Sequence, residues 1–246
     1  TIKPFVYRYQ AKSPYYYQMD GAFLLCPNRR IGLKSPLVPK CYNTMYLSFG
    51  KRVFDLLFAM ISLVILIPIF IVVGILIKLE SKGPVFFIQT RLGENKKKID
   101  VIKFRSMTHK SRDVEQQVYK SDPEITKVGY MIRRFKIDEM PQIFNVLKGE
   151  MSIIGPRPCL PSTPDKFDLR DSYRFMVKPG LSSIAGVNGS IYLTWEEKWY
   201  YDKYYVENLS LILDIKIVLK TILVIFSGEE KFLNRPKIKQ DGAKKI

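Results

Sequence analysis

One long run of apolar residues dominates the hydrophobic pattern of this chain. The 22 residues from Leu56 to Ile77 carry no charge. As a straight helix they would extend about 33 Å, which is enough to cross the hydrocarbon core of a bilayer. A buried soluble helix of this length and purity is rare, so residues 51–80 are predicted to form a membrane helix. The flanking residues are basic on both sides: Lys51, Arg52, Lys78 and Lys82.

Pro68 lies in the middle of this segment. Its ring removes one backbone hydrogen bond and clashes with the preceding turn, so we expect a kink or break near Ile67. Each half would be about 13–18 Å long, which is too short to cross alone. Basic residues on both flanks give no orientation bias. A re-entrant helix that enters and leaves through one leaflet fits both facts, and a single span with a proline kink is the alternative.

The residues after the apolar run predict a small β-hairpin. Residues 84–89 and 99–104 are rich in β-prone side chains. Between them, Gly93-Glu94-Asn95-Lys96 has the composition of a turn.

Helical patterns follow the hairpin. Residues 125–149 are predicted to be mainly helical, with a second helix opening near Pro141, because proline is tolerated in a first helical turn. Leu209–Phe226 is apolar but interrupted by charges. It is therefore either an amphipathic helix at the membrane interface or a helix packed on the domain. The predicted fold class is α+β and mostly helical, with a kinked re-entrant membrane helix, a small hairpin and amphipathic interfacial helices.

The pattern divides the chain into four parts. Residues 1–50 hold five prolines, many aromatics and seven basic residues against one acid. No regular period persists there, so we expect an irregular extension lying on the membrane surface. The membrane helix, residues 51–80, and a folded domain, residues 81–226, come next. Residues 227–246 contain six Lys or Arg residues against three acids and are expected to be disordered or lipid-facing.

Composition narrows the class of protein. With 47% hydrophobic residues the chain is too apolar for a solvated tail. Its net charge of +17 favours anionic partners: nucleic acid, acidic lipid or phosphorylated substrates. Cys26, Cys41 and Cys159 are odd in number and widely spaced, which fits a reducing cytosolic setting better than a disulfide framework. The single histidine, His109, excludes mechanisms that need two imidazoles.

Two adjacent carboxylates, Asp138 and Glu139, lie next to the helix predicted to open at Pro141. The positive end of a helix keeps such groups ionised and able to hold a divalent cation. An ionised aspartate is a competent nucleophile toward phosphorus once a metal neutralises the charge of the target. Taken alone, the pair is more typical of acids that cap a first helical turn.

Basic residues near these acids are candidates for phosphate binding. Arg133 and Arg134 precede the acidic pair, and Gly155-Pro156-Arg157-Pro158 displays one guanidinium from a stiffened backbone. The fork of arginine suits bidentate contacts to phosphate. Lys103 and Arg105 lie two residues apart on the second hairpin strand, so they share a face. Individually, each residue is also typical of a solvated surface.

The order of these motifs resembles the bacterial sugar transferase family, the monotopic polyprenyl-phosphate phosphoglycosyl transferases. The likeness covers about residues 50–226. The motifs that carry it are Lys51-Arg52-Val53-Phe54-Asp55 before the apolar helix, Lys103-Phe104-Arg105-Ser106-Met107, Ile137-Asp138-Glu139-Met140-Pro141-Gln142, Asn145-Val146-Leu147-Lys148-Gly149-Glu150-Met151-Ser152, Gly155-Pro156-Arg157-Pro158, Lys178-Pro179-Gly180 and Val187-Asn188-Gly189.

The resemblance implies a covalent two-step transfer. In this family an aspartate attacks the sugar-linked phosphate of a UDP-sugar, UMP leaves, and polyprenyl (undecaprenyl) phosphate takes the phosphosugar from the aspartyl intermediate. By this likeness Asp138 is the nucleophile, and Asp138 and Glu139 hold Mg²⁺. Arg133 would meet the lipid phosphate. The anionic pocket would be lined by Lys103, Arg105, Arg157 and Pro158.

The resemblance also implies a place in the cell. Residues 81–226 would be a catalytic domain facing the cytoplasm, held by a monotopic anchor in the lipids of the bacterial inner membrane. The reaction would be the first membrane step in assembling a capsule, an O-antigen, an exopolysaccharide or a glycoprotein glycan. The resemblance specifies a class of donor rather than one sugar. It does not specify the oligomeric state.

Two other interpretations of the chain are open. The chain has Gly186 and Ser190 where the family commonly has Gln and Arg. This departure leaves open a catalytically weak family member that acts as a membrane scaffold for polysaccharide assembly. Nucleic-acid binding would account for the net charge but for neither the apolar run nor the spaced motifs, so no nucleic-acid partner is expected.

Overall fold

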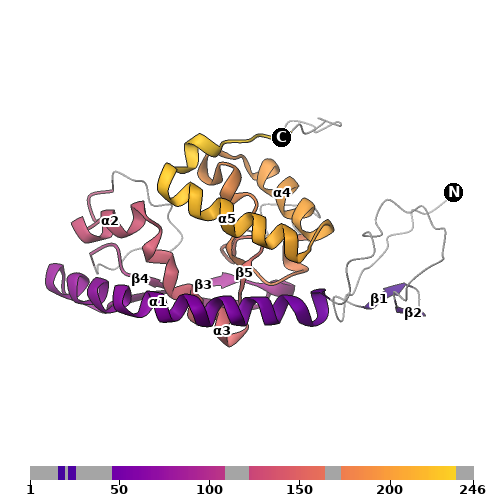
Figure 1. Cartoon of the computed structure of the whole chain (residues 1–246), viewed down its shortest axis with the longest axis horizontal. Helices are drawn as coiled ribbons and strands as arrows, with labels where there is room; N and C mark the ends of the chain where they lie inside the picture. Colours follow the sequence, from indigo (N-terminus) through magenta and orange to yellow (C-terminus); the bar gives the residue numbers. More distant parts are fainter. Residues whose placement is uncertain (1–15, 20–21, 26–45, 109–121, 164–172, 237–246) are drawn as a thin grey trace.

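The computed structural model describes residues 16–19, 22–25, 46–108, 122–163 and 173–236. Within these ranges helices predominate, and the strands form three two-stranded sheets (Figure 1). This agrees with the mostly helical α+β prediction. Three residues singled out above lie outside the described residues: Cys26, Cys41 and His109.

The described part of the N-terminal extension holds one short hairpin. Strands β1 (Tyr16–Met19) and β2 (Ala22–Leu25) pair antiparallel. A turn of π-helix, η1 (Tyr46–Gly50), then leads directly into the long apolar helix. The extension was predicted to be irregular throughout. Strands of 4 residues are too short for an alternating pattern to stand out in a sequence.

The apolar run forms one helix, α1 (Lys51–Glu80), of 30 residues. Among the described residues it alone is long and apolar enough to cross a membrane, judged by length and composition, and 11% of its most apolar stretch is buried. The helix continues through Pro68, so the break predicted near Ile67 is not present. A proline removes only one hydrogen bond from a helix. The hydrogen bonds on either side of Pro68 are sufficient to keep this helix continuous.

One side of α1 packs on the rest of the protein and the other side is exposed. Asp55, Ala59, Val73 and Ile77 are its buried residues. Figure 1 shows α2, α4 and α5 on one side of α1. The exposed apolar side chains of α1 form a broad surface: Leu57, Met60, Ile61, Val64, Ile65, Ile67, Ile69, Ile71, Val72, Ile75, Leu76 and Leu79.

The predicted hairpin is present. Strand β3 (Phe86–Leu92) pairs antiparallel with β4 (Lys98–Phe104), with Gln89 opposite Val101. A 3₁₀ turn, η2 (Glu94–Lys96), connects the strands. Phe104 anchors the hairpin on α1 through an edge-to-face contact with Phe70, whose ring centroid is 5.2 Å away.

The region predicted to be helical, residues 125–149, contains three helical elements. They are α2 (Lys127–Arg134), the 3₁₀ helix η3 (Ile137–Gln142) and α3 (Ile143–Lys148). The second helix predicted to open near Pro141 is α3, which begins two residues later, and Pro141 itself lies inside η3. Asp138 and Glu139 therefore lie in the first turn of η3.

The last sheet and two longer helices complete the domain. Strand β5 (Ser152–Ile154) pairs parallel with β6 (Gly180–Ser182). Helices α4 (Trp195–Glu207) and α5 (Leu211–Ser227) follow. The main core lies between these elements, α3 and the first half of α1, and its fully buried side chains include Ile143, Val146, Met151, Ile154, Tyr205 and Val206.

Helix α5 packs on the domain along one side, as one of the two alternatives predicted. Asp214, Ile217 and Val224 are buried against the domain. Its other side exposes apolar side chains: Leu211, Ile212, Ile215, Leu219, Ile222, Leu223 and Phe226. An apolar surface of this kind suits the membrane interface.

The chain beyond Ser227 was predicted to be a disordered or lipid-facing tail, and its first part is ordered. A 3₁₀ helix, η8 (Glu229–Phe232), follows α5. The Asn234 N–H donates to the Asn188 carbonyl at 3.0 Å, and the Tyr201 hydroxyl donates to the Asn234 carbonyl at 2.7 Å. These polar contacts fasten the segment to the domain, which a count of its charges does not indicate.

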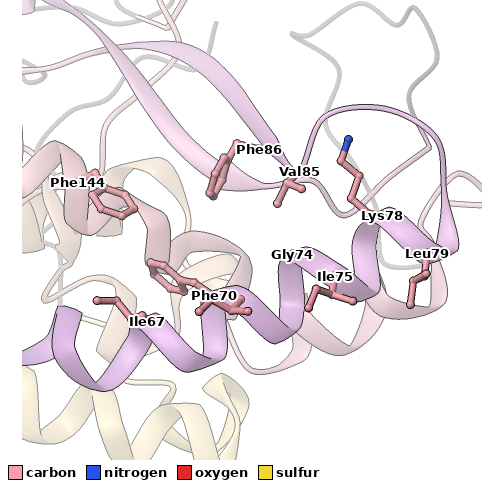
Figure 2. Close-up of a pocket in the computed structure, with 10 residues that line it drawn as sticks. Ile67, Phe70, Gly74, Ile75, Lys78, Leu79, Val85, Phe86 and Phe144 are labelled. Carbon is pink, nitrogen blue, oxygen red and sulfur yellow. The ribbon is translucent and has the colours of Figure 1, made fainter.

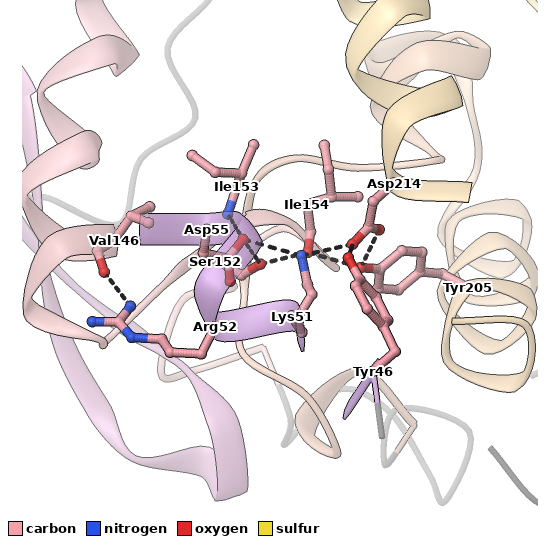
Figure 3. Close-up of polar contacts among 10 residues, drawn as sticks. All are labelled: Tyr46, Lys51, Arg52, Asp55, Val146, Ser152, Ile153, Ile154, Tyr205 and Asp214. Atoms are coloured by element: carbon pink, nitrogen blue, oxygen red, sulfur yellow. Dashed lines mark hydrogen bonds and ion pairs between the residues drawn. The ribbon is translucent and has the colours of Figure 1, made fainter. Parts of the chain in front are cut away.

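A buried charge network holds the start of α1 (Figure 3). The Lys51 ammonium lies 3.1 Å from Asp55 and 2.9 Å from Asp214 on α5. The Asp55 carboxylate also accepts from the Ser152 hydroxyl and the Ile153 N–H. The motif that begins α1 thus fixes this helix to α5 and β5 at once.

Candidate active site

The chain before the candidate nucleophile is fixed by contacts around α2. The Thr126 side chain caps this helix, accepting from the Gly129 N–H at 2.9 Å. Two further N–H groups at its start donate to the Glu80 carboxylate at the end of α1. Gly129 lies against the Ser106 carbonyl, where a Cβ would come within 1.9 Å of the oxygen. These contacts set the direction in which the chain leaves α2 toward Asp138.

Lys136 turns the chain between α2 and η3. Its φ of 58° lies in the left-handed region, where residues other than glycine are uncommon. Its N–H donates to the Arg133 carbonyl at 3.1 Å, and its own carbonyl accepts from the Glu139 N–H at 3.3 Å. The turn brings Asp138 and Glu139 out of α2 and onto the separate first turn of η3.

Both carboxylate oxygens of Glu139 are paired with cations. Oε1 lies 3.1 Å from Lys103 Nζ on β4, and Oε2 accepts from the Arg157 guanidinium. Burial alone would raise the pKa of Glu139, but Arg157, Lys103 and Lys136 outweigh it and hold the pKa well below its usual range. Glu139 is therefore a fixed, ionised acid that joins β4 to the loop after β5.

Asp138 has a buried oxygen without a hydrogen-bond partner. Within the described part of the chain, its Oδ1 meets no donor. Burial raises the pKa of Asp138 to about 6, and the neighbouring Glu139 carboxylate adds to this shift. Three cations oppose the shift without cancelling it: Lys103, Arg133 and Lys136. Because an unpartnered buried carboxylate is costly to keep, such groups concentrate at functional sites.

Arg133 is close enough to this pair to interact electrostatically with both acids. Its Nε donates to the Ser106 hydroxyl at 2.7 Å. Burial lowers the pKa of Arg133, while Asp138, followed by other acids, supports its charge. Since arginine stays charged even when its pKa is lowered, Arg133 adds a guanidinium to the surroundings of Asp138.

Arg157 reaches the same site from the loop after β5. Its guanidinium contacts Glu139 and donates to the Leu181 carbonyl at 3.2 Å. The Arg157 carbonyl in turn accepts from Arg174 at 3.0 Å. These contacts hold the side chain and its backbone, so Arg157 is presented as a half-exposed cation in a fixed place.

The motif around Arg157 packs directly on the segment before β6. A Cβ at Gly155 would lie 2.4 Å from the Lys178 carbonyl, so this close approach requires glycine. The Gly180 N–H donates to the Pro156 carbonyl at 2.9 Å. Pro158 follows Arg157 and is half-buried. The motifs at residues 155–158 and 178–180, which are separate in the sequence, thus pack together and hold the backbone of Arg157.

Arg105 was predicted to line the anionic pocket, and the structure places it elsewhere. Its guanidinium is buried and donates to the Ser81 and Lys82 carbonyls at 2.7 Å each, and to the Ile77 carbonyl at 3.3 Å. These are acceptor groups at the C-terminal end of α1, where carbonyls lack helical partners. Arg105 therefore caps α1 and does not face Asp138.

A cavity of about 300 Å³ opens beside the catalytic candidates. Helices α1 and α5 supply apolar walls, among them Phe58 and Ile222. Gly186 and Ser190, the two departures from the family pattern, also line it. The charged lining residues are Lys136, Glu139, Arg157 and Glu229.

The fit to a metal ion depends on the Asp138–Glu139 pair. The described residues contain no group of three or more His, Cys, Asp or Glu side chains arranged to hold a metal. Mg²⁺ needs few protein ligands when substrate phosphates and water supply the others. The unpartnered Asp138 Oδ1 fits this requirement, whereas both oxygens of Glu139 are already paired with Lys103 and Arg157.

Comparison with known proteins identifies the family. A family model described as bacterial sugar transferase matches residues 46–228. The chain belongs to the bacterial sugar transferase family. The match is slightly longer than the span indicated by the motifs, and it includes η1 and all of α5.

Three relatives of this sugar transferase illustrate the likeness. The UDP-N-acetylgalactosamine-undecaprenyl-phosphate N-acetylgalactosaminephosphotransferase of Aeromonas hydrophila is 42% identical over 188 residues, which cover 74% of this chain and 44% of the relative. The UDP-glucose:undecaprenyl-phosphate glucose-1-phosphate transferase of Klebsiella pneumoniae is 38% identical over 209 residues, covering 81% and 43%. The exopolysaccharide production protein ExoY of Sinorhizobium fredii is 34% identical over 189 residues, covering 70% and 84%. The chain spans less than half the length of the first two.

The sequence of this sugar transferase did not predict that Lys136 and Glu229 belong to the site. Lys136 stands two residues before Asp138, and this closeness was a signal that could have been used. Glu229 lies 2.8 Å from Lys136. Glu229 follows Asp138 by 91 positions in the sequence (229 minus 138). No local sequence pattern therefore links Glu229 to the site.

Proposed function

We propose that this sugar transferase moves a sugar 1-phosphate from a UDP-sugar to undecaprenyl phosphate, with Asp138 as the nucleophile. The relatives from Aeromonas hydrophila and Klebsiella pneumoniae are named for such transfers. The observation that carries the proposal is the buried Asp138 oxygen, which has no partner within the described residues. A carboxylate kept unpaired beside several cations is suited to attack an anionic phosphate.

The reaction has two steps that pass through one covalent intermediate. The Asp138 carboxylate attacks the sugar-linked phosphorus, and the bond from that phosphorus to the bridging oxygen breaks, so UMP leaves with the electron pair. An oxygen of undecaprenyl phosphate then attacks the same phosphorus, and the aspartyl oxygen leaves, which restores Asp138. A ping-pong mechanism follows from this sequence.

The surrounding cations bind and orient the phosphates. Lys103 and Arg157 are held by Glu139, so their positions are set before substrate arrives. Preorganised cations stabilise the charge that develops in the transition state without reorganising. Arg133 is proposed to meet the acceptor phosphate, and Pro158 to shape the edge of the pocket beside Arg157.

Asp138 and Glu139 would hold Mg²⁺ together with the donor phosphates. The metal would shield the diphosphate charge and stabilise the leaving UMP. Asp138 offers its unpartnered oxygen directly. Glu139 is proposed to become a ligand when the donor phosphates take over its two cations.

The anchor is proposed to be monotopic and re-entrant. At its start, α1 is fixed by Lys51 to Asp214 at 2.9 Å. At its end, α1 is fixed by Arg105 and by the contact of Glu80 with α2. A helix of this length would measure about 45 Å, and both of its ends contact the same domain. We infer that both ends lie on the cytoplasmic face of the inner membrane and that α1 bends at Pro68 when lipid surrounds it.

An apolar groove supports this placement in lipid (Figure 2). It has a volume of about 610 Å³ and lies between the second half of α1 and the start of the hairpin. Phe70, Val85 and Phe86 line it, and Lys78 supplies a cation at one end. Apolar walls with a basic residue nearby are what a lipid-facing surface offers to anionic phospholipids.

The experiment that tests the proposed function is a panel of donors. The purified protein, in detergent with MgCl₂ and undecaprenyl phosphate, is given UDP-glucose, UDP-galactose and their N-acetylamino forms, and released nucleotide is measured. UMP release with at least one donor, lost in Asp138→Asn, is expected. Release of UDP would contradict the chemistry, because it requires cleavage on the sugar side of the phosphate. If no donor in the panel leads to nucleotide release, the alternative is favoured in which the protein is a membrane scaffold for polysaccharide assembly.

A further inference from the structure

Glu229 lies just beyond the family match, which ends at residue 228, and yet its carboxylate reaches the site. Its Oε1 is 2.8 Å from the Nζ of Lys136. The Glu229 side chain is 15% exposed, while that of Lys136 is 41% exposed. A carboxylate from a separate part of the chain is thus buried against the cation that precedes the nucleophile.

The position of Glu229 does not depend on this ion pair alone. The chain after it is fastened by the backbone of Asn234, which bonds to Asn188 and Tyr201. Arg235 lies 3.1 Å from Glu197 on α4. With α5 before it and these contacts after it, the Glu229 backbone is held from both sides.

Lys136 has more than one acidic neighbour. Its charge acts on both Asp138 and Glu139, in addition to its contact with Glu229. If Lys136 bonded to Asp138, it would occupy the oxygen that the reaction needs. Bonded to Glu229, it stays close to the nucleophile and leaves that oxygen without a partner.

We propose that Glu229 is a positioning residue, whose carboxylate holds the Lys136 ammonium away from the Asp138 oxygen. Glu229, in the segment that follows α5, therefore completes the active site. This inference rests on the proposed function of Asp138 as the nucleophile. Glu229 acts through Lys136 and does not itself touch the reacting atoms.

The effect of Glu229 extends to Arg157. The Glu139 carboxylate raises the pKa of Arg157 most, and Glu229 adds a smaller contribution of the same sign. The Glu229 carboxylate thus pairs with Lys136 and supports the charge of Arg157. Its neighbour Glu230 is exposed and has the same charge, so it provides a matched control.

The first test compares Glu229→Gln with Glu230→Gln in UMP release. Glu229→Gln should lower kcat about tenfold, because Lys136 is then free to pair with the nucleophile. The KM for the donor should change less than about threefold, because Arg157 keeps its stronger contact with Glu139. Glu230→Gln should match the unsubstituted enzyme. Rates are expressed per folded molecule, and Glu229→Asp should recover part of the loss.

The second test is a double substitution. In Glu229→Gln/Lys136→Met the cation that would block Asp138 is gone, so this variant should be no slower than Lys136→Met alone. Losses that multiply, as independent structural damage would produce, overturn the proposal. So does a Glu229→Gln enzyme with kcat within about twofold of Glu230→Gln.

A third readout does not need turnover. Labelling of Asp138 by a water-soluble carbodiimide, measured by mass spectrometry, should fall several-fold in Glu229→Gln and return in the double variant. Unchanged labelling overturns the role of Glu229. If the unsubstituted protein releases no UMP from any donor, the proposed function fails, and this labelling still decides whether Glu229 controls Lys136.

Discussion

The Lys51 ammonium at the start of α1 lies 2.9 Å from the Asp214 carboxylate on α5, and the Asp214 side chain is fully buried. The same carboxylate accepts hydrogen bonds from the Tyr46 and Tyr205 hydroxyls at 2.7 and 2.8 Å. The two helices with the largest exposed apolar surfaces are therefore joined by a buried charge pair. This joint sets the surface that we propose faces the lipid.

Replacing Asp214 with Asn should destabilise the fold strongly. Removing one partner of a buried pair leaves the other charge uncompensated, which costs about 3–5 kcal/mol. Chemical unfolding in detergent measures this loss. The control is Glu207→Gln, which removes the exposed Lys203–Glu207 pair and should cost less than about 1 kcal/mol. Equal losses in the two variants would show that the network does not hold α1.

Asp138→Asn should stabilise the protein in a manner that depends on pH. An acid whose folded pKa, here about 6, exceeds its unfolded pKa of about 3.9 holds its proton more tightly when folded. The cost of ionising it is fully present above the folded pKa and disappears below the unfolded pKa. In EDTA, the variant should gain about 3 kcal/mol of unfolding free energy at pH 8 and about half of that at pH 5. Destabilisation at pH 8 would contradict the buried, unpartnered state of Asp138.

Arg105 and Lys103 belong to one motif but should respond differently to substitution. Arg105→Met removes charge-assisted hydrogen bonds to the end of α1 and should cost about 3 kcal/mol or more of stability. Its turnover per folded molecule should remain within about threefold of normal. Lys103→Met should instead lower kcat/KM at least about tenfold, with little change in the unfolding midpoint. If Arg105→Met instead lowered activity without lowering stability, Arg105 would have to be assigned to the substrate pocket.

Both ends of α1 should be accessible from one face of the membrane. The test uses two variants, each with one cysteine, at the exposed position Phe49 or Lys82. The native Cys26, Cys41 and Cys159 are removed from both. Each variant should react with a maleimide that cannot cross the membrane. The reagent should reach both only from the cytoplasmic side of membrane vesicles. Labelling of the two positions from opposite sides would favour the single span.

The sequence predicted the elements and residues that depend on local pattern. The apolar helix, the hairpin and the Asp138–Glu139 pair all follow from neighbouring residues. The role of Arg105 was missed because its guanidinium could bind a phosphate or a helix end, and only the tertiary position of Ser81 decides between them. Glu229 was missed for the same reason, since its partner Lys136 is distant in the chain. The second α-helix begins two residues after Pro141, because a 3₁₀ helix that follows the left-handed turn at Lys136 includes this proline.

Mass spectrometry of the trapped enzyme shows whether Asp138 forms a transient bond to phosphorus. The protein is incubated with the donor that supports UMP release, with Mg²⁺ and without undecaprenyl phosphate, then quenched and digested. We expect a peptide containing Asp138 whose mass is increased by one phosphosugar. This adduct should be absent in Asp138→Asn and should disappear when undecaprenyl phosphate is added. Full turnover with no such adduct, or an adduct on another residue, would contradict it.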